Sequence, residues 1–470
     1  MIQQTNEGVT TEDSILIEGV LRIAERLLEA EREEPVAPFR TPEEMVELID
    51  PFLSAQGMSS QAVLDALETV VLATPRTCSN QFFNQLFSGR LNMATAGEVL
   101  ASLLNTSMYT YKVAGPNALI ETALTQHLAS KVGYENGEGV FSPGGSLANL
   151  TALIMARNEA MPGARESGLD ARAVAVYASA HCHYSVRKAC GMIGLGRRNL
   201  RLVEVDDRGR MNPDTLASMI AADRAARVTP IAIVATAGTT VRAAFDPIEP
   251  IAAVAKTHGI WLHVDGAMGG AMLLSEAHAD LTAGSELADS WTWDAHKLMG
   301  IPLSSSVILC KQRGMLAKHF DEAASYLFQG DADEYNHGTR SIQCGRRNDA
   351  LKLWAAWKQL GDDGFQKRID HLFTLARFTA KEIERRPALE LTCTPESVNV
   401  CFEATGKPSD AICETLRREQ RAMVGHAEVN ARRVIRVACV NADMTTEDMI
   451  AFLDAVEDVA GQSPDGDNSL

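Results

Sequence analysis

Apolar residues recur at helical spacing through the first part of the chain. Residues 15–32 place them among charges, and residues 60–72 repeat that arrangement. Between these segments, Thr41 precedes Pro42 and two glutamates, which is typical of a capped helix start. We therefore expect helices up to about residue 72, and so few helices bury little apolar surface without a packing partner.

From about Gly137 the pattern changes to short apolar runs that alternate with helical stretches. Continuous apolar runs predict strands buried on both faces, and strands separated by helices predict a mostly parallel sheet. The expected strands are 173–177, 202–205, 230–235, 260–264 and 307–310, and the expected helices include 147–158, 212–221 and 248–257. The fold class is therefore α/β, with helices covering both faces of the sheet.

The pattern changes again after Gln343. A long helical stretch at 348–385 leads to short strand-like runs at 389–393, 397–402 and 434–440, and then to a helix at 446–459. This succession predicts a small α+β domain. The final residues, 461–470, are polar and rich in turn-forming types, so we expect a disordered tail.

Length and charge narrow the functional classes. At 470 residues and 46% hydrophobic content the chain should form two or three domains of about 100 to 200 residues. Its net charge of −17 argues against nucleic acid and against an anionic membrane surface, because both need a basic face. An acidic substrate stays compatible, since a few arginines in one cleft can outweigh a distant acidic surface.

Cysteine usage and the N-terminus indicate the compartment. The 9 cysteines form no CxxC pair and no zinc-ligand spacing, so neither a metal site nor a disulfide framework is indicated. The N-terminus lacks a basic and apolar leader, and no apolar run reaches the roughly 18 to 20 residues of a membrane span. We expect a soluble cytoplasmic protein.

The most informative motif is a His-Lys pair, His296 and Lys297, just past the strand-like residues 291–293. A lysine amine there can bond covalently to an aldehyde cofactor. Ligands of parallel sheets bind beyond the carboxyl ends of the strands, where Thr236, Asp265 and Lys297 are all expected. Four further motifs precede the pair, namely Pro143-Gly144-Gly145-Ser146, His183-Tyr184-Ser185, Thr236-Ala237-Gly238-Thr239-Thr240 and His263-Val264-Asp265-Gly266-Ala267.

The order and spacing of these motifs resemble the pyridoxal phosphate (PLP) amino-acid decarboxylases that include glutamate decarboxylase and cysteine sulfinate decarboxylase. The likeness runs from about Cys78 to about Ala460 and includes residues 82–89, 105–111, 326–329 and 342–346. It implies a PLP-transferase fold of type I with a mostly parallel seven-stranded sheet. It also implies a homodimer with the active site at the subunit interface.

The resemblance divides the chain into segments. Residues 1–78 would be a helical dimerisation segment, 79–345 a large PLP-binding domain, 346–460 a small C-terminal domain and 461–470 the tail. PLP would be the cofactor, and a metal is not expected.

By resemblance, Lys297 holds the aldehyde of PLP. Asp265 would lie beside the pyridine nitrogen and keep it protonated, which lets the ring accept electrons. The alternative for an Asp-Gly pair is an ordinary turn. His183 would stack on the ring, with His181 as a competing candidate, and Thr236 and Ala267 would lie near it, although a threonine at a strand end is commonly only structural.

The phosphate is expected at Gly144, Gly145 and Ser146, because a glycine-rich turn that opens a helix suits an anion. A Gly-Gly-Ser turn alone is weak evidence of this. By resemblance, His296 and Ser306 add phosphate contacts. Relatives often have Asn-Pro before the His-Lys pair, whereas this chain has Asp294 and Ala295. Because a carboxylate repels a phosphate, we expect Asp294 to face elsewhere.

Decarboxylation requires a proton donor for the substrate's Cα. Residues 330–338 form a polar segment with a glycine at each end, as in a mobile lid. Tyr335 falls where relatives place the tyrosine that donates this proton, although the preceding stretch is a few residues shorter than in glutamate decarboxylase. A solvent-exposed loop tyrosine is the alternative.

Three residues bear on the substrate. Arg436 lies on an apolar strand-like run, where its guanidinium is costly without a carboxylate partner, and by resemblance it binds the α-carboxylate. Gln85 matches a glutamine that contacts the side-chain acid group. Phe87 matches cysteine sulfinate decarboxylases, whereas glutamate decarboxylases have a small hydroxyl residue there. Residues 112–117, from Lys112 to Asn117, depart from the acidic-substrate pattern.

We therefore expect a carboxy-lyase that decarboxylates a small acidic L-amino acid to the amine and carbon dioxide. The shorter pocket favours aspartate or cysteine sulfinate over glutamate. The alternatives are a decarboxylase of diaminobutyrate or an aromatic amino acid, a decarboxylation-dependent oxidative deaminase and a non-catalytic PLP-binding protein. A nicotinamide enzyme is disfavoured because no GxGxxG follows the first strand.

Overall fold

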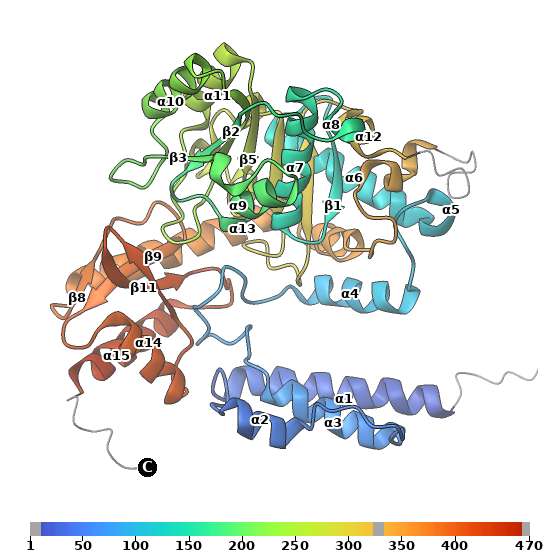
Figure 1. The fold of residues 1–470 in the computed structure, drawn as a ribbon. Coiled ribbons are helices and arrows are strands. Elements are labelled where there is room, and N and C mark those ends of the chain that lie inside the picture. Colours follow the sequence, from blue (N-terminus) through green and yellow to red (C-terminus); the bar gives the residue numbers. More distant parts are fainter. Residues whose placement is uncertain (1–10, 323–332, 463–470) are drawn as a thin grey trace, which may run out of the picture.

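The computed structural model describes residues 11–322 and 333–462 (Figure 1). Residues 326–329 of the resembled motifs, the lid residues 330–332 and most of the expected tail lie outside these ranges. Within them, the helices are too short or too polar to cross a bilayer.

The N-terminal segment forms the three expected helices, α1 (Thr11–Glu33), α2 (Pro42–Ile49) and α3 (Ser60–Ala73). They make a layer of their own on one side of the molecule (Figure 1). The predicted cap of α2 is confirmed, because the Thr41 hydroxyl accepts from the Glu44 amide and the Glu44 carboxylate accepts from the Thr41 amide. Many apolar side chains of this layer stay exposed, including Ile17, Leu21 and Leu53.

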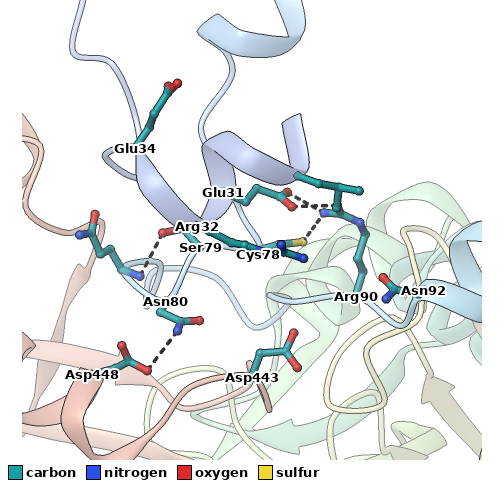
Figure 2. A pocket seen from close by; sticks show the side chains of 12 residues that line it. Glu31, Arg32, Glu34, Cys78, Ser79, Asn80, Arg90, Asn92, Asp443 and Asp448 are labelled. Atoms are coloured by element: carbon teal, nitrogen blue, oxygen red, sulfur yellow. Dashed lines mark hydrogen bonds and ion pairs between the residues drawn. The ribbon is translucent and has the colours of Figure 1, made fainter. Parts of the chain in front are cut away.

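Polar contacts join this layer to the rest of the chain (Figure 2). Arg90 donates to both oxygens of Glu31, at 2.6 and 2.8 Å, and to the Cys78 sulfur at 2.7 Å. Nearby, Asn80 of the segment that follows α3 donates to Asp448 at 3.1 Å. These residues surround a polar cavity of about 470 Å³ that contains none of the predicted site residues.

The predicted seven-stranded, mostly parallel sheet is confirmed. Its strand order is β1-β7-β6-β5-β4-β2-β3, and only β7 runs antiparallel to its neighbours β1 and β6. The strands are β1 (Glu138–Ser142), β2 (Val174–Ser179), β3 (Leu200–Val203), β4 (Thr229–Thr236), β5 (Trp261–Asp265), β6 (Ser290–Asp294) and β7 (Ser306–Cys310).

Helices cover both faces of this sheet. On one face, Tyr177 and Ile233 belong to a core that includes side chains of α6, α11 and α13. On the other face, Val176 and Val234 pack with side chains of α7 and α9. The helices of this domain are α4 (Asn92–Leu104), α5 (Tyr111–Ala114), α6 (Pro116–Val132), α7 (Gly145–Ala160), α8 (Ala164–Ser167), α9 (Tyr184–Met192), α10 (Pro213–Ala225), α11 (Ile248–His258) and α12 (Met315–Phe320).

The C-terminal part forms the expected small α+β unit. Its helix α13 (Ala350–Arg385) breaks its regular geometry at Gly361, whose φ is 62°. An antiparallel sheet follows in the order β10-β11-β9-β8. Its elements are β8 (Leu389–Leu391), β9 (Asn399–Ala404), α14 (Ser409–Arg418), β10 (Gly425–Val429), β11 (Arg432–Ala438) and α15 (Thr446–Gly461).

The segment around Phe83, which follows the N-terminal helices, also forms hydrogen bonds beside this small sheet. The Phe83 amide donates to the Met423 carbonyl at 2.7 Å, and the Ala438 amide donates to the Phe83 carbonyl at 3.1 Å. The segment therefore runs beside β11. This places Asn84 and its neighbours next to Arg436.

Candidate active site

Parallel strands bring three of the predicted residues to one edge of the sheet. Thr236 ends β4, Asp265 ends β5, and the two residues pair in register. Lys297 follows the end of the adjacent β6 by three residues. Because β4, β5 and β6 are parallel neighbours, their carboxyl ends meet at the same edge. The predicted grouping is confirmed.

The Lys297 amine lies in a turn whose other side chains are mostly buried. Its nitrogen is 3.4 Å from Asp294 Oδ2, and the side chain is 22% exposed. The turn is fixed by the Ala295 amide, which donates to the Ser305 carbonyl at 2.8 Å. A lysine that is partly exposed and held at one end of the sheet can reach a ligand there.

The Asp265 carboxylate is buried and receives directed hydrogen bonds. Asn149 Nδ2 donates to its Oδ2 at 2.8 Å, and the Ala267 amide approaches its Oδ1 at 3.3 Å. Asp265 is therefore more than a turn residue, because its side chain is held by a second element, α7. This arrangement can present a fixed carboxylate to a ligand over the strand ends.

Asn149 is a buried residue that sequence reasoning missed. Its amide nitrogen donates to Asp265 and, at 3.0 Å, to Ser185 Oγ. Its carbonyl oxygen accepts from His263 Nε2 at 2.9 Å and from Thr292 Oγ1 at 2.8 Å. The only signal in the sequence is one amide within the apolar stretch that opens α7. Asn149 joins three strand or helix ends to α7.

The donors of this network point one way. Trp261 donates to Ser290 Oγ at 3.0 Å, and that hydroxyl lies 2.9 Å from His263 Nδ1. Because the Asn149 carbonyl oxygen can only accept, His263 Nε2 donates to it, and Nδ1 of the neutral ring accepts from the Ser290 hydroxyl. Burial lowers the pKa of His263 to about 4, so its ring is neutral at neutral pH. The chain of donors ends on Asp265.

His183 joins the same network at the start of α9. Its Nδ1 lies 2.8 Å from Ser185 Oγ, and Ser185 accepts from Asn149. Burial lowers the pKa of His183, so the ring is held neutral. The competing His181 is exposed and is not hydrogen-bonded to Asn149 or Ser185 in the described chain. The geometry favours His183 over His181 as the ring beside the site.

The glycine turn lies against Asp294. Gly144 caps α7 with a φ of 116°, and Gly145 begins the helix. A side chain on Gly145 would meet the Asp294 oxygens at 2.7 and 2.9 Å, whereas Ser146 is exposed. The expectation that Asp294 faces away from this turn is therefore wrong. Partial positive charge at a helix start favours a nearby carboxylate, and the expectation from repulsion left this attraction out.

The two other residues expected at the phosphate contact the same region. Ser306 Oγ donates to Asp294 Oδ1 at 2.6 Å. The His296 ring is buried, with its Nδ1 beside the backbone of Ser305, and burial lowers its pKa. Ser306 thus contacts Asp294 and His296 Nε2 lies 3.7 Å from it, whereas the contact of either residue with a phosphate stays a prediction.

The chemistry of these groups fits a phosphorylated pyridine aldehyde. Thr236 Oγ1 is buried and has no hydrogen-bond partner among the described residues, so the site holds a polar atom without a protein partner. Ala267 is small and buried at the end of β5. The site also contains the Lys297 amine, the fixed Asp265 carboxylate and the flat His183 imidazole, and it lies at the start of α7. PLP would find a group for its aldehyde, its ring nitrogen and its phosphate.

The substrate residues lie at the edge of the small domain. Arg436 donates to the carbonyls of Asn84 and Thr240, the latter at 3.1 Å, and is not paired with a carboxylate of the described chain. Burial lowers the pKa of Arg436. Phe87 is half-buried, with its ring 6.4 Å from that of Phe82, and Gln85 is exposed.

Tyr335 is not brought to Lys297 within the described contacts. It ends a short 3₁₀ turn (Asp333–Tyr335) and packs on Tyr111, with the ring centres 5.9 Å apart. Its neighbours Met108 and Ala118 belong to the α5 and α6 region. Its role as proton donor stays a prediction.

The altered segment from Lys112 to Asn117 makes a turn in which Ala114 and Asn117 are buried. Gly115 separates α5 from α6 with a φ of 55°, and Pro116 begins α6. Asn117 donates to the Ala114 carbonyl at 2.9 Å and accepts from Asn348 at 2.9 Å. The departure from the family pattern therefore has a defined structural role at this turn.

The sequence and fold match known proteins over most of their length. Residues 42–405 match the family described as the pyridoxal-dependent decarboxylase conserved domain. Human cysteine sulfinic acid decarboxylase is 38% identical over 445 residues, which cover 90% of each chain. Mouse acidic amino acid decarboxylase GADL1 is 35% identical over 447 residues, covering 90% of this chain and 81% of that protein.

A solved structure has the same fold. The crystal structure of mouse CSAD superimposes with a TM-score of 0.93 at 34% identity. The match covers 96% of this chain and 99% of that one. The seven-stranded sheet and the small antiparallel sheet are thus those of an experimentally determined decarboxylase structure.

The buried His263 predicts a pH dependence of stability. Its folded pKa of about 4 lies below the usual 6.5, so the unfolded chain binds the extra proton between these values. Stability from this group is complete above pH 6.5 and is lost as pH falls toward 4, by on the order of 3 kcal/mol. His263→Gln should therefore flatten the rise of the melting temperature between pH 5 and 7.

The exposed His426 supplies the control, since His426→Gln should leave the slope of the wild-type curve unchanged. Calorimetric melting curves at several pH values measure all three proteins. Parallel curves for the wild type and His263→Gln would contradict the assignment of a neutral buried ring.

Proposed function

Because the chain belongs to the pyridoxal-dependent decarboxylase family, and is therefore a PLP-dependent amino-acid decarboxylase, we propose that it acts on a short acidic L-amino acid. Aspartate and cysteine sulfinate are the substrates we favour over glutamate. The observation that carries the proposal is the 38% identity to a cysteine sulfinic acid decarboxylase over 90% of both chains. The products would be carbon dioxide and the corresponding amine.

Different residues would bind different parts of PLP. When bound, PLP withdraws electrons from the bond that breaks. Lys297 supplies the amine that holds its aldehyde, and Asp265 supplies the carboxylate beside its ring nitrogen. Asn149 fixes the direction of that carboxylate through the 2.8 Å hydrogen bond from its amide. A fixed acceptor loses little free energy to reorganisation when charge develops.

Arg436 would orient the substrate. Its side chain is partly buried, yet among the described residues its guanidinium bonds only to backbone carbonyls. A carboxylate that enters the site can form the bidentate pair that these carbonyls cannot. Holding the α-carboxylate in this way would also fix the angle between the breaking bond and the cofactor ring.

Phe87 and Gln85 would select the side chain of the substrate. Both lie in the segment that the small sheet holds beside Arg436. The bulk of Phe87 shortens the space available to a side chain, which favours aspartate and cysteine sulfinate. The Gln85 amide can donate to a second acidic group, and its exposure in the single chain is consistent with a site completed by a partner.

A homodimer would complete the site. The apolar side chains of α1 to α4 and the connections between them are unusually exposed, and an apolar surface of this extent marks a contact with another chain. They include Ile17, Val20, Leu21, Phe52, Leu53, Val99, Leu100 and Leu103. Tyr335, which packs on Tyr111 in its own chain, could then deliver its proton to a site at the interface.

A panel of amino acids tests the reaction. We expect carbon dioxide release from cysteine sulfinate or aspartate to exceed that from glutamate, tyrosine and 2,4-diaminobutyrate. Lys297→Ala should abolish both this activity and the visible absorbance of covalently held PLP, because the bonding amine is gone. Activity on tyrosine or diaminobutyrate alone would overturn the acidic assignment and leave the family assignment intact.

Enlarging the pocket should change the preference. Phe87→Ser is expected to raise kcat/KM for glutamate relative to cysteine sulfinate by about 10-fold, since a few methylene groups are worth that order of discrimination. Phe87→Leu, which keeps an apolar side chain, should shift the ratio much less. An unchanged ratio in Phe87→Ser would show that this ring does not limit substrate length.

Charges on the exposed apolar surface should weaken the dimer. Leu53→Glu and Leu103→Glu each introduce a carboxylate that would have to be buried in the interface. Sedimentation should show a dimer for the wild type and a larger monomer fraction for both variants. Leu287→Glu, at an exposed leucine outside α1 to α4, is the matched control and should stay dimeric. A monomeric wild type would contradict the proposal.

A further inference from the structure

The Asp294 carboxylate lies inside the expected cofactor site. It ends β6, and its side chain is 4% exposed. Ser306, which pairs with it in register from β7, donates to Oδ1 at 2.6 Å. The other oxygen, Oδ2, is 3.4 Å from the Lys297 nitrogen and 3.7 Å from His296 Nε2. One oxygen is thus fixed, and the other points toward the two residues expected to hold PLP.

The same carboxylate lies against the first residue of α7. Its two oxygens lie 2.7 and 2.9 Å from the position of a Cβ on Gly145, the first residue of this 16-residue helix. The helix start carries partial positive charge and unpaired amides, and it favours an anion. The protein therefore already places one anion where the phosphate of the cofactor is expected.

The neighbouring charges do not neutralise a second anion. Lys297 is the cation that contacts Asp294, and its amine is also the group expected to bond to the aldehyde. Burial lowers the pKa values of His296 and His183, so both rings are neutral near pH 7. Asp265 adds a further carboxylate, and Lys352 on α13 is engaged by Glu98 and Asp349.

We propose that Asp294 couples the loading of PLP to the uptake of one proton from solvent. Two ionised anions at one helix start repel each other, and adjacent carboxylates relieve such repulsion by sharing a proton. An O–H bond would form on Asp294 Oδ2 or on a phosphate oxygen, and nothing is oxidised or reduced. The inference rests on the cofactor and not on the choice of amino-acid substrate.

Binding measurements on the cofactor-free protein test this coupling. Calorimetry of PLP binding in buffers of different ionisation enthalpy counts the protons taken up. Pyridoxal, which lacks the phosphate, is the matched ligand. We expect the wild type to take up one proton more with PLP than with pyridoxal, and its PLP affinity to fall by up to about 10-fold per pH unit more steeply.

Asp294→Asn keeps the size of the side chain and removes its charge. We expect this variant to bind PLP about 10-fold more tightly at pH 8, because the repulsion is gone, and to lose most of the additional proton uptake. Its affinity for pyridoxal should match that of the wild type. Equal changes for both ligands would overturn the proposal, since Asp294 would then act through Lys297 alone.

The wild-type comparison of the two ligands needs no variant. If Asp294→Asn fails to fold, equal proton counts for PLP and pyridoxal in the wild type would still contradict the proposal. An excess proton for PLP that persists unchanged in a folded Asp294→Asn protein would contradict it as well, because the proton uptake would then not depend on the charge of Asp294.

Discussion

The amide of Asn149 is the contact on which the rest of the site depends. It ties α7 to the ends of β5 and β6 through Asp265, His263 and Thr292, and to α9 through Ser185. All of these groups are buried, so an unmade hydrogen bond would cost about 1 to 3 kcal/mol. The network therefore fixes the strand ends, the helix start and the imidazole of His183 relative to one another.

The direction of the donors explains how this network serves the site. From Trp261 through Ser290 and His263 to Asn149, each group donates its hydrogen bond in the direction of Asp265. The His263 ring is neutral because burial disfavours its charged form, so it can donate with one nitrogen and accept with the other. A buried polar network that is fully satisfied rigidifies the groups it contains. The Asp265 carboxylate is thus held by uncharged hydrogen-bond donors.

The sequence predicted the positions that follow from burial. Strands β2, β4, β5 and β7 lie close to their predicted ranges because both faces of the sheet are covered, which leaves continuous apolar runs. Strand β10 was not predicted, since its residues, such as His426 and Glu428, alternate between partly buried and exposed positions and show no apolar run. Motif order then identified Thr236, Asp265 and Lys297, because parallel strand ends meet at one edge.

Contacts between distant polar residues could not be predicted in the same way. Asn149 lies on an apolar helix, and nothing in its local sequence indicates four partners on other elements. Asp294 was misjudged because repulsion from a phosphate was considered without the attraction of the α7 start. Gln85 and Tyr335 were identified by motif alone, and in the described chain Gln85 is exposed and Tyr335 packs on Tyr111.

Asp265 and Asp294 show how one residue type acquires two roles. Both are buried carboxylates at the ends of adjacent parallel strands. Asp265 receives an amide hydrogen bond from a neutral network and has no cation in direct contact among the described residues. Asp294 receives a hydroxyl and contacts the Lys297 amine and the helix start. The environment alone thus separates a carboxylate held by a neutral network from one placed beside a cation and a helix start.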